Sequence, residues 1–147
     1  MSEPRTSCCV PVVKFPHGQA SRQQLESEIL KAKIARAEAS GPRAVTQHAT
    51  IMDISPDGTL STLREGSNQW TAFPGNENQI GNVPMCCDPM GLQWVMDILE
   101  DKPRPTNSRP GLIYMLCGAT QHSNVDHTDH ESPPIPIGPH YMIIWPF

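Results

Sequence analysis

The side chains best equipped for chemistry lie close together between residues 121 and 131. Three histidines and three acidic residues occur there: His122, Asp126, His127, Asp129, His130 and Glu131. Neutral imidazole and carboxylate groups are the usual ligands of zinc, nickel and non-heme iron. A histidine beside a carboxylate is also the standard pair for proton transfer. A solvated loop is the alternative interpretation of the same pattern.

The spacing of these histidines makes a metal site the less favoured of the two interpretations. The pattern H-x4-H-x2-H differs from H-E-x-x-H and matches no named metal motif. We therefore expect a protein without a cofactor. A divalent transition metal held by His122, His127 and His130 is the alternative.

His140 is the strongest single candidate for an acid or base. It follows Gly138-Pro139 and precedes an apolar run, so we expect its ring at the mouth of a sheet. Burial there would lower the pKa of the imidazole and keep it neutral, as a general base requires. His122 or Asp126 would be its partner. The alternative is a structural histidine bonded to the backbone.

Three further residues are candidates for a site on the strands. Asp53 stands in the apolar run 51–54, where it either faces water or is a desolvated carboxylate with a raised pKa. Trp70 and Tyr141 are placed to shape a pocket for a flat organic ligand, although such aromatics also serve as core residues. Arg64 and Glu65 resemble a surface ion pair, which contributes little to stability.

The five cysteines are odd in number and include two adjacent pairs: Cys8, Cys9, Cys86, Cys87 and Cys117. A secreted disulfide framework usually has an even number of spaced cysteines. We therefore interpret them as reduced thiols of an intracellular, cytoplasmic protein, since the N-terminus lacks a basic region followed by an apolar stretch. Cys87 precedes a predicted helix, whose dipole would lower the pKa of its thiol and make it a candidate nucleophile.

The elements that position these residues are two helices and several short strands. Ser21 and Gln24 form a capping-box pattern ahead of a helical apolar stripe, and Ser40-Gly41-Pro42 ends it. Asp88 and Pro89 begin a second helix, which Pro103 ends. Strands are expected at 48–54, 59–64, 70–73, 111–117 and 141–145, with a long Gly- and Asn-rich loop at 74–84. We predict an α+β fold with a mainly antiparallel sheet of four or five strands, formed by residues 20–147 after a flexible arm at 1–19.

Composition excludes several classes of function. The net charge is −4 and the basic residues form no cluster, so nucleic-acid binding has no electrostatic basis. No apolar run approaches the length of a membrane helix. The chain carries neither a phosphate-binding Gly-rich loop nor a G-x-S-x-G motif.

Five stretches of the chain resemble an uncharacterised family of small proteins, many of whose bacterial members carry an export signal. They are ATIMD (49–53), LREGSNQWT (63–71), PMC (84–86), GLIYML (111–116) with SNVD (123–126), and GPHYMI (138–143). The resemblance covers about residues 45–147 and implies no particular activity. It draws attention to the polar residues of the shared blocks, which are Asp53, Glu65, Asn68, Asn124, Asp126 and His140.

The chain departs from that family in three respects. It lacks the export signal, which favours an intracellular role. It has Ala72 where the family tends to place a cysteine, which argues against a disulfide between that position and Cys86. It ends at Phe147 where relatives continue, so the last strand matches either an internal or a terminal strand of the family.

These observations lead to three functional hypotheses. The first is a small-molecule enzyme of secondary metabolism, a lyase, isomerase or cyclase, with His140, His122, Asp126 and Asp53 in catalysis. Its substrate would contact Trp70, Tyr141, Asn68, Asn124 and Glu65. The second is a metal- or ligand-binding module without turnover. The third is a structural or interaction protein whose apolar strands form a homodimer.

Overall fold

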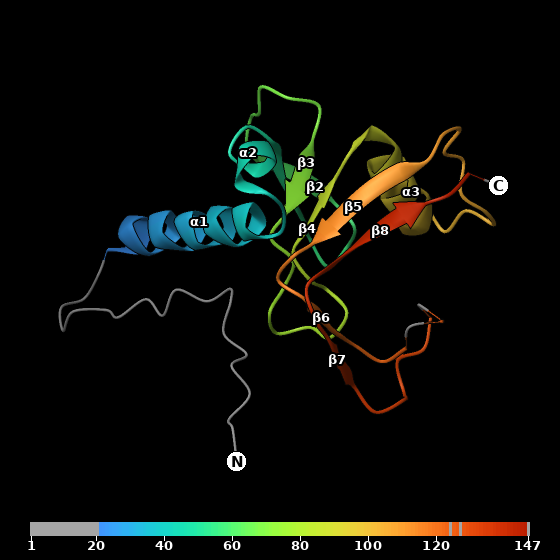
Figure 1. Ribbon diagram of the computed structural model, residues 1–147. Coiled ribbons are helices and arrows are strands. Elements are labelled where there is room, and N and C mark those ends of the chain that lie inside the picture. The colour runs from blue at the N-terminus through green and yellow to red at the C-terminus, as the bar shows by residue number, and fades with distance from the viewer. Residues whose placement is uncertain (1–20, 124, 127, 147) are drawn as a thin grey trace, which may run out of the picture.

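A six-stranded sheet with a helix on each face organises the molecule (Figure 1). The computed structural model describes residues 21–123, 125–126 and 128–146. The strand order is β2-β1-β3-β4-β5-β8. The strands are β1 (Thr50–Ile54), β2 (Leu60–Arg64), β3 (Thr71–Phe73), β4 (Met85–Cys87), β5 (Gly111–Met115) and β8 (His140–Ile144). Only the β1–β3 pairing is parallel within this sheet, so the predicted α+β class and the mainly antiparallel sheet are confirmed.

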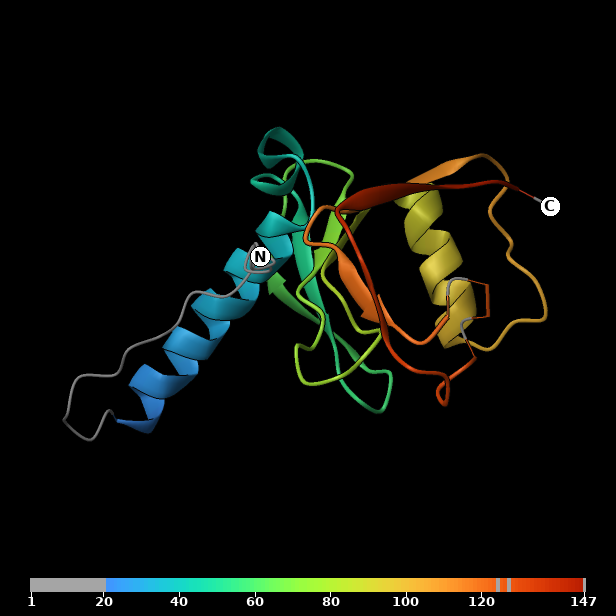
Figure 2. The same cartoon turned by 60° about the horizontal axis from the view of Figure 1, so that its bottom comes forward.

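Helix α1 (Arg22–Ala39) begins with the predicted capping box. The hydroxyl of Ser21 accepts from the Gln24 N–H at 3.3 Å, and the Gln24 side chain accepts from the Ser21 N–H at 2.9 Å. The C-terminal half of α1 packs on the sheet through Ala37, which is buried with Ile51. The N-terminal half projects away from the sheet (Figures 1 and 2).

Helix α3 (Pro89–Leu99) covers the opposite face (Figure 2). The carboxylate of Asp88 accepts from the Gly91 N–H at 2.7 Å, which confirms the predicted N-cap. Val95 packs there against Phe73 and Ile113. Neighbouring residues of a strand point to opposite faces of the sheet. On β4, Cys86 therefore packs in the layer under α1, and Cys87 packs in the layer under α3.

The structure also contains elements that the sequence analysis did not predict. Helix α2 (Arg43–Thr46) follows α1, and strands β6 (Ala119–Gln121) and β7 (Ile135–Ile137) form a separate two-stranded sheet. Strand β4 and the short hairpin strands are three residues long, too short for a period-2 pattern to register. The larger sheet consequently has six strands where four or five were expected. The predicted N-terminal arm at 1–19 lies outside the described residues.

Among the described residues, no helix has both the length and the apolar character that a bilayer crossing requires.

Candidate ligand-binding site

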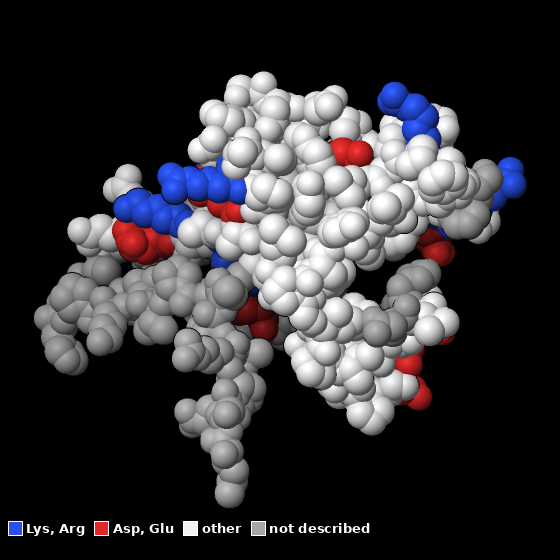
Figure 3. All heavy atoms as spheres, in the orientation of Figure 1, with Lys and Arg blue, Asp and Glu red and all other residues white. Residues whose placement is uncertain are grey.

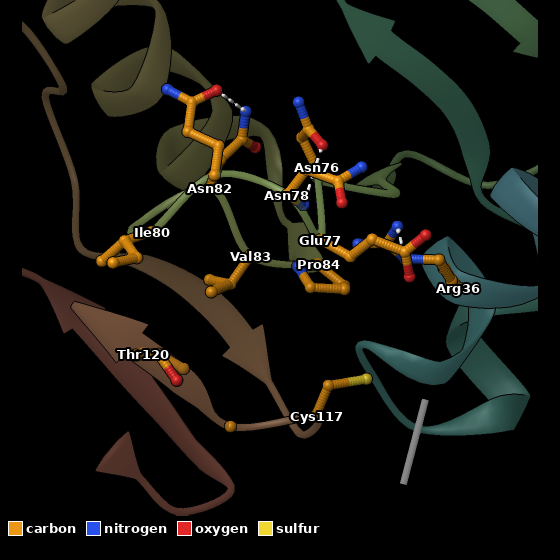
Figure 4. A pocket seen from close by; sticks show the side chains of 13 residues that line it. Arg36, Asn76, Glu77, Asn78, Ile80, Asn82, Val83, Pro84, Cys117 and Thr120 are labelled. Carbon is orange, nitrogen blue, oxygen red and sulfur yellow. Dashed lines mark hydrogen bonds and ion pairs between the residues drawn. The ribbon is translucent and has the colours of Figure 1, made fainter. Parts of the chain in front are cut away.

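A slot of about 380 Å³ opens between the loop at 74–84 and the turn that follows β5 (Figure 4). Ile80, Val83 and Pro84 form an apolar wall. The facing wall is the segment 117–120, and Arg36 of α1 lies at one end. A volume of this order falls at the small end of the range for ligand pockets.

The loop that forms the apolar wall is held by hydrogen bonds within itself and to the facing segment. The Asn76 N–H donates to the Asn82 carbonyl at 2.9 Å, and the Gly81 N–H donates across the slot to the Thr120 carbonyl at 2.8 Å. Gly75 has a positive φ of 62°, and a β-carbon there would lie 2.6 Å from the carbonyl carbon of Val83. Only glycine permits the two ends of the loop to lie this close, and this close approach fixes the shape of the loop.

Arg36 is the charged residue with the most distinctive position in this slot. Its side chain is 13% exposed, and its Nη1 atom lies 3.4 Å from Oε2 of Glu77, whose side chain is 51% exposed. Within the described part of the chain, the guanidinium makes no hydrogen bond beyond this ion pair. A guanidinium carries five N–H donors, so Arg36 retains capacity to bind an anion in the slot.

The acidic residues of the 121–131 segment shape their own loop. Asp126 accepts from the Thr128 N–H at 2.9 Å and from its hydroxyl at 2.6 Å. Asp129 accepts from the N–H groups of Glu131 and Ser132, both at 3.0 Å. Hydrogen bonds from Ser132 lower the pKa of Asp129 to about 2. These carboxylates act as turn-forming acceptors.

The histidines of this segment are only partly brought together. The rings of His122 and His130 are 6.4 Å apart, edge to face, and Nδ1 of His122 contacts the Ser132 carbonyl. His127 and Asn124 lie outside the described residues. Among the residues described, no three metal-ligating side chains converge, so the metal set with His127 stays a prediction.

His140 and His122 leave the β6–β7 hairpin at opposite ends. Gln121 pairs with Ile135, and Ala119 pairs with Ile137. His122 follows the first pair, whereas His140 lies beyond the second. Nδ1 of His140 is 2.8 Å from the carbonyl oxygen of Gly138, the backbone contact expected of a structural histidine.

The remaining polar candidates bind the layers of the fold to one another. Asp53 forms an ion pair with Lys33 of α1 and does not simply face water. Asn68 donates to the Val45 carbonyl at 2.9 Å and accepts from the Trp70 N–H at 2.9 Å.

The expected pairing of Arg64 with Glu65 is wrong. Arg64 pairs instead with Glu38 of α1 and donates to the carbonyls of Thr46 at 2.9 Å and Ala49 at 3.2 Å. Glu65 is exposed. Adjacent strand residues point to opposite faces, and Arg64 is on the face that α1 covers.

The two aromatic candidates belong to one row of rings. Trp70 stacks on Tyr114 with ring centroids 5.5 Å apart, and Tyr114 meets Tyr141 edge to face at 6.5 Å. Trp70 is half-buried, whereas Tyr141 is largely exposed at the edge of the sheet. The sequence analysis thus identified two of the three rings in this aromatic row. The row lies outside the slot.

The cysteines differ from the expectation in two ways. Cys86 and Cys87 are free, as expected of reduced thiols, and they are buried. Burial raises the pKa of Cys86 to about 12 and also raises the pKa of Cys87, so the expected lowering of the Cys87 pKa is wrong and its candidacy as a nucleophile loses that support. The N-terminus of α3 is occupied by Asp88. Cys117 is disulfide-bonded, with its partner outside the described residues, which is at odds with five reduced thiols.

We expect these three cysteines to be distinguishable by alkylation. In the folded protein at neutral pH, N-ethylmaleimide should leave Cys86 and Cys87 unmodified, because burial and a raised pKa suppress the thiolate. Guanidinium chloride should expose both, whereas Cys117 should react only after reduction. Peptide mass spectrometry reads each position separately. Rapid labelling of folded Cys87 would contradict the structure.

Comparison of this chain with protein-family models, with curated proteins and with solved structures finds no match.

The slot uses residues that the sequence analysis did not select. The one available signal was the long Gly- and Asn-rich loop at 74–84, a length that is uncommon unless a loop covers a site. Nothing in the sequence distinguished Arg36 from the other charged residues of the first helix, which are expected on its solvent-exposed face.

Proposed function

We propose that this protein is a binding module without turnover for a small molecule with an apolar body and an anionic end. The observation that carries the proposal is the position of Arg36. Its guanidinium is mostly buried at the end of a slot with an apolar wall, and its counter-ion is the half-exposed Glu77. This corresponds to the second hypothesis from the sequence.

The ligand would bind by exchange of carboxylates. An incoming carboxylate forms two parallel hydrogen bonds with the Arg36 guanidinium, which is the favoured geometry of this pair. Glu77 is released to water at little cost, since its side chain is already half exposed. The apolar body of the ligand then lies against Val83 and Pro84, where it loses contact with water.

Turnover has less support in this slot than binding. Among the described residues that line it, the side chains that titrate are Arg36 and Glu77, since Cys117 is disulfide-bonded. An acid–base pair would require a histidine or a second carboxylate at hydrogen-bond distance from the substrate. The acid–base enzyme built on His140 remains a hypothesis.

Octanoate is a suitable probe of the slot. In an NMR titration of the ¹⁵N-labelled protein, we expect it to shift the amide signals of residues 76–84 and 118–120. Arg36→Met should weaken binding by about tenfold or more, the usual effect of losing a charged hydrogen-bond partner. Glu77→Gln should strengthen binding several-fold, because the competing carboxylate is gone.

Two controls separate binding from structural damage. Arg22→Met removes an exposed arginine of the same helix, whose partner is Glu26 at 2.9 Å, and should leave octanoate binding unchanged. Octanol should bind Arg36→Met and the wild type equally. If the slot signals do not respond to octanoate, or if Arg36→Met binds it as well as the wild type, the proposal is wrong.

A further inference from the structure

Strand β8 presents an apolar row at the edge of the large sheet. The exposed fractions of Tyr141, Ile143 and Trp145 are 61%, 62% and 65%. Tyr141 and Ile143 alternate along β8 and lie on the face opposite α3, and Trp145, one residue beyond the end of β8, continues the alternation. On β5, Tyr114 and Leu112 stand next to Tyr141 and Ile143 and widen the row into a patch. Exposure of this kind calls for an explanation, since contiguous apolar surface usually marks an interaction site.

The two edge strands of the sheet, β2 and β8, differ in the features that prevent association with another strand. On β2, Ser61 and Thr62 are the exposed residues, and the β1–β2 register shifts between Ile51 and Met52, which interrupts the regular ladder. Polar residues and bulges are common means of preventing edge-to-edge association. Strand β8 has no charged side chain and no proline within it. Within the part of the chain that the structure describes, no strand pairs with its outer side.

The face around β8 is also electrically neutral. β5 and β8 contain no Lys, Arg, Asp or Glu. In Figure 3 the surface over these two strands is white, and the charged side chains in view lie outside this area. A neutral face can be apposed to a copy of itself without repulsion between like charges, which a charged face cannot.

We propose that β8 is the interface of a homodimer, in which two copies pair antiparallel about a two-fold axis at Ile143. Alternate N–H and C=O groups of β8 point away from β5 and would bond to the same strand of the second copy. This register sets Ile143 opposite the partner's Ile143 and Tyr141 opposite the partner's Trp145. The two sheets become one continuous sheet.

The sequence of β8 favours a second copy over a foreign peptide. The apolar row is symmetric about Ile143, with an aromatic residue two positions away on each side. Antiparallel self-pairing therefore matches each aromatic ring with another aromatic ring, and such cross-strand pairs stabilise a sheet. An isologous interface requires this self-complementarity. The inference is independent of the ligand slot, which β8 does not line.

Sedimentation of the full chain tests the dimer. We expect the wild type to shift from monomer to dimer as its concentration rises. Ile143→Lys places two like charges opposite each other at the axis and should raise the dissociation constant by about 100-fold or more. Thr62→Lys on β2 is the matched edge control and should leave the dimer intact. Circular dichroism should show both variants folded, because both side chains are exposed.

Charge reversal at the axis distinguishes a symmetric dimer from other associations. Ile143→Glu alone should be monomeric, whereas an equimolar mixture of Ile143→Glu and Ile143→Lys should re-form a dimer. A wild type that stays monomeric at every concentration would overturn the proposal. So would an Ile143→Lys variant that dimerises normally, or a mixture of the two charged variants that stays monomeric.

Discussion

Replacement of Gly66 by alanine is expected to lower the free energy of unfolding by about 3 kcal/mol or more. A β-carbon at this position would lie 2.2 Å from the Thr50 nitrogen, 2.4 Å from the Ala49 carbonyl carbon and 2.6 Å from the His48 carbonyl oxygen. All three atoms belong to backbone, so no side-chain rotation relieves the clash. The segment after β2 must move away from the start of β1.

That movement would break the hydrogen bonds that connect the two segments. The His48 carbonyl accepts from the Ser67 N–H at 2.8 Å and from the Asn68 N–H at 3.1 Å. The Gly66 N–H donates to the Thr50 hydroxyl at 3.2 Å. The clash and the lost hydrogen bonds both destabilise the folded state.

Urea denaturation followed by circular dichroism measures the effect on Gly66→Ala. Gly138→Ala is the matched control, because a β-carbon at Gly138 meets nothing within 4 Å. It should change the free energy of unfolding by less than about 1 kcal/mol. Equal stability of the two variants would show that the close approach at Gly66 is not a constraint on the fold.

The parts of the fold that the sequence predicts well are those determined by local chemistry. Ser21 and Gln24 specify the start of α1 because both hydrogen bonds of a capping box form within one turn. Asp88 and Pro89 specify the start of α3 in the same way. The long strands β1, β5 and β8 are each five residues of mostly apolar sequence, enough for a pattern to be read.

The parts that it misses depend on partners distant in the chain. β4 is a strand because it lies between β3 and β5, and its three residues carry no pattern of their own. Arg36 becomes a site residue only because the loop with Glu77 folds against α1. Neither relation can be read from spacing along the sequence.

Polar residues were over-interpreted as chemical groups for a related reason. Type and spacing cannot show whether a carboxylate is already occupied by hydrogen bonds. Asp126 and Asp129 accept from backbone N–H groups of their own loop, and Asp53 pairs with Lys33. The sequence analysis passed over Asp97, a carboxylate that accepts hydrogen bonds from three residues.

Asp97 is a buried carboxylate, 2% exposed, that connects α3 to the segment after it. It accepts from Lys102 at 2.8 Å, from the Gln93 side chain at 2.9 Å, and from both the N–H and the hydroxyl of Thr106. The hydrogen bond from Lys102, with those from Thr106 and Gln93, holds the pKa of Asp97 well below its ordinary value. Asp97→Asn removes the charge and turns one acceptor into a donor that faces other donors. We expect it to lower the Tm by about 5 °C or more.

The pH dependence of stability gives a second measure of this carboxylate. A group whose pKa is lower in the folded state stabilises the fold above its unfolded pKa of about 3.9, and this contribution is lost as pH falls toward the folded pKa. The wild type should therefore lose stability steeply below about pH 5, and Asp97→Asn should lose less over the same range. Asp101→Asn is the control, since Asp101 is exposed and its positive φ of 50° suits asparagine. If Asp97→Asn keeps the wild-type acid slope, other carboxylates cause the acid sensitivity and the role assigned to Asp97 is wrong.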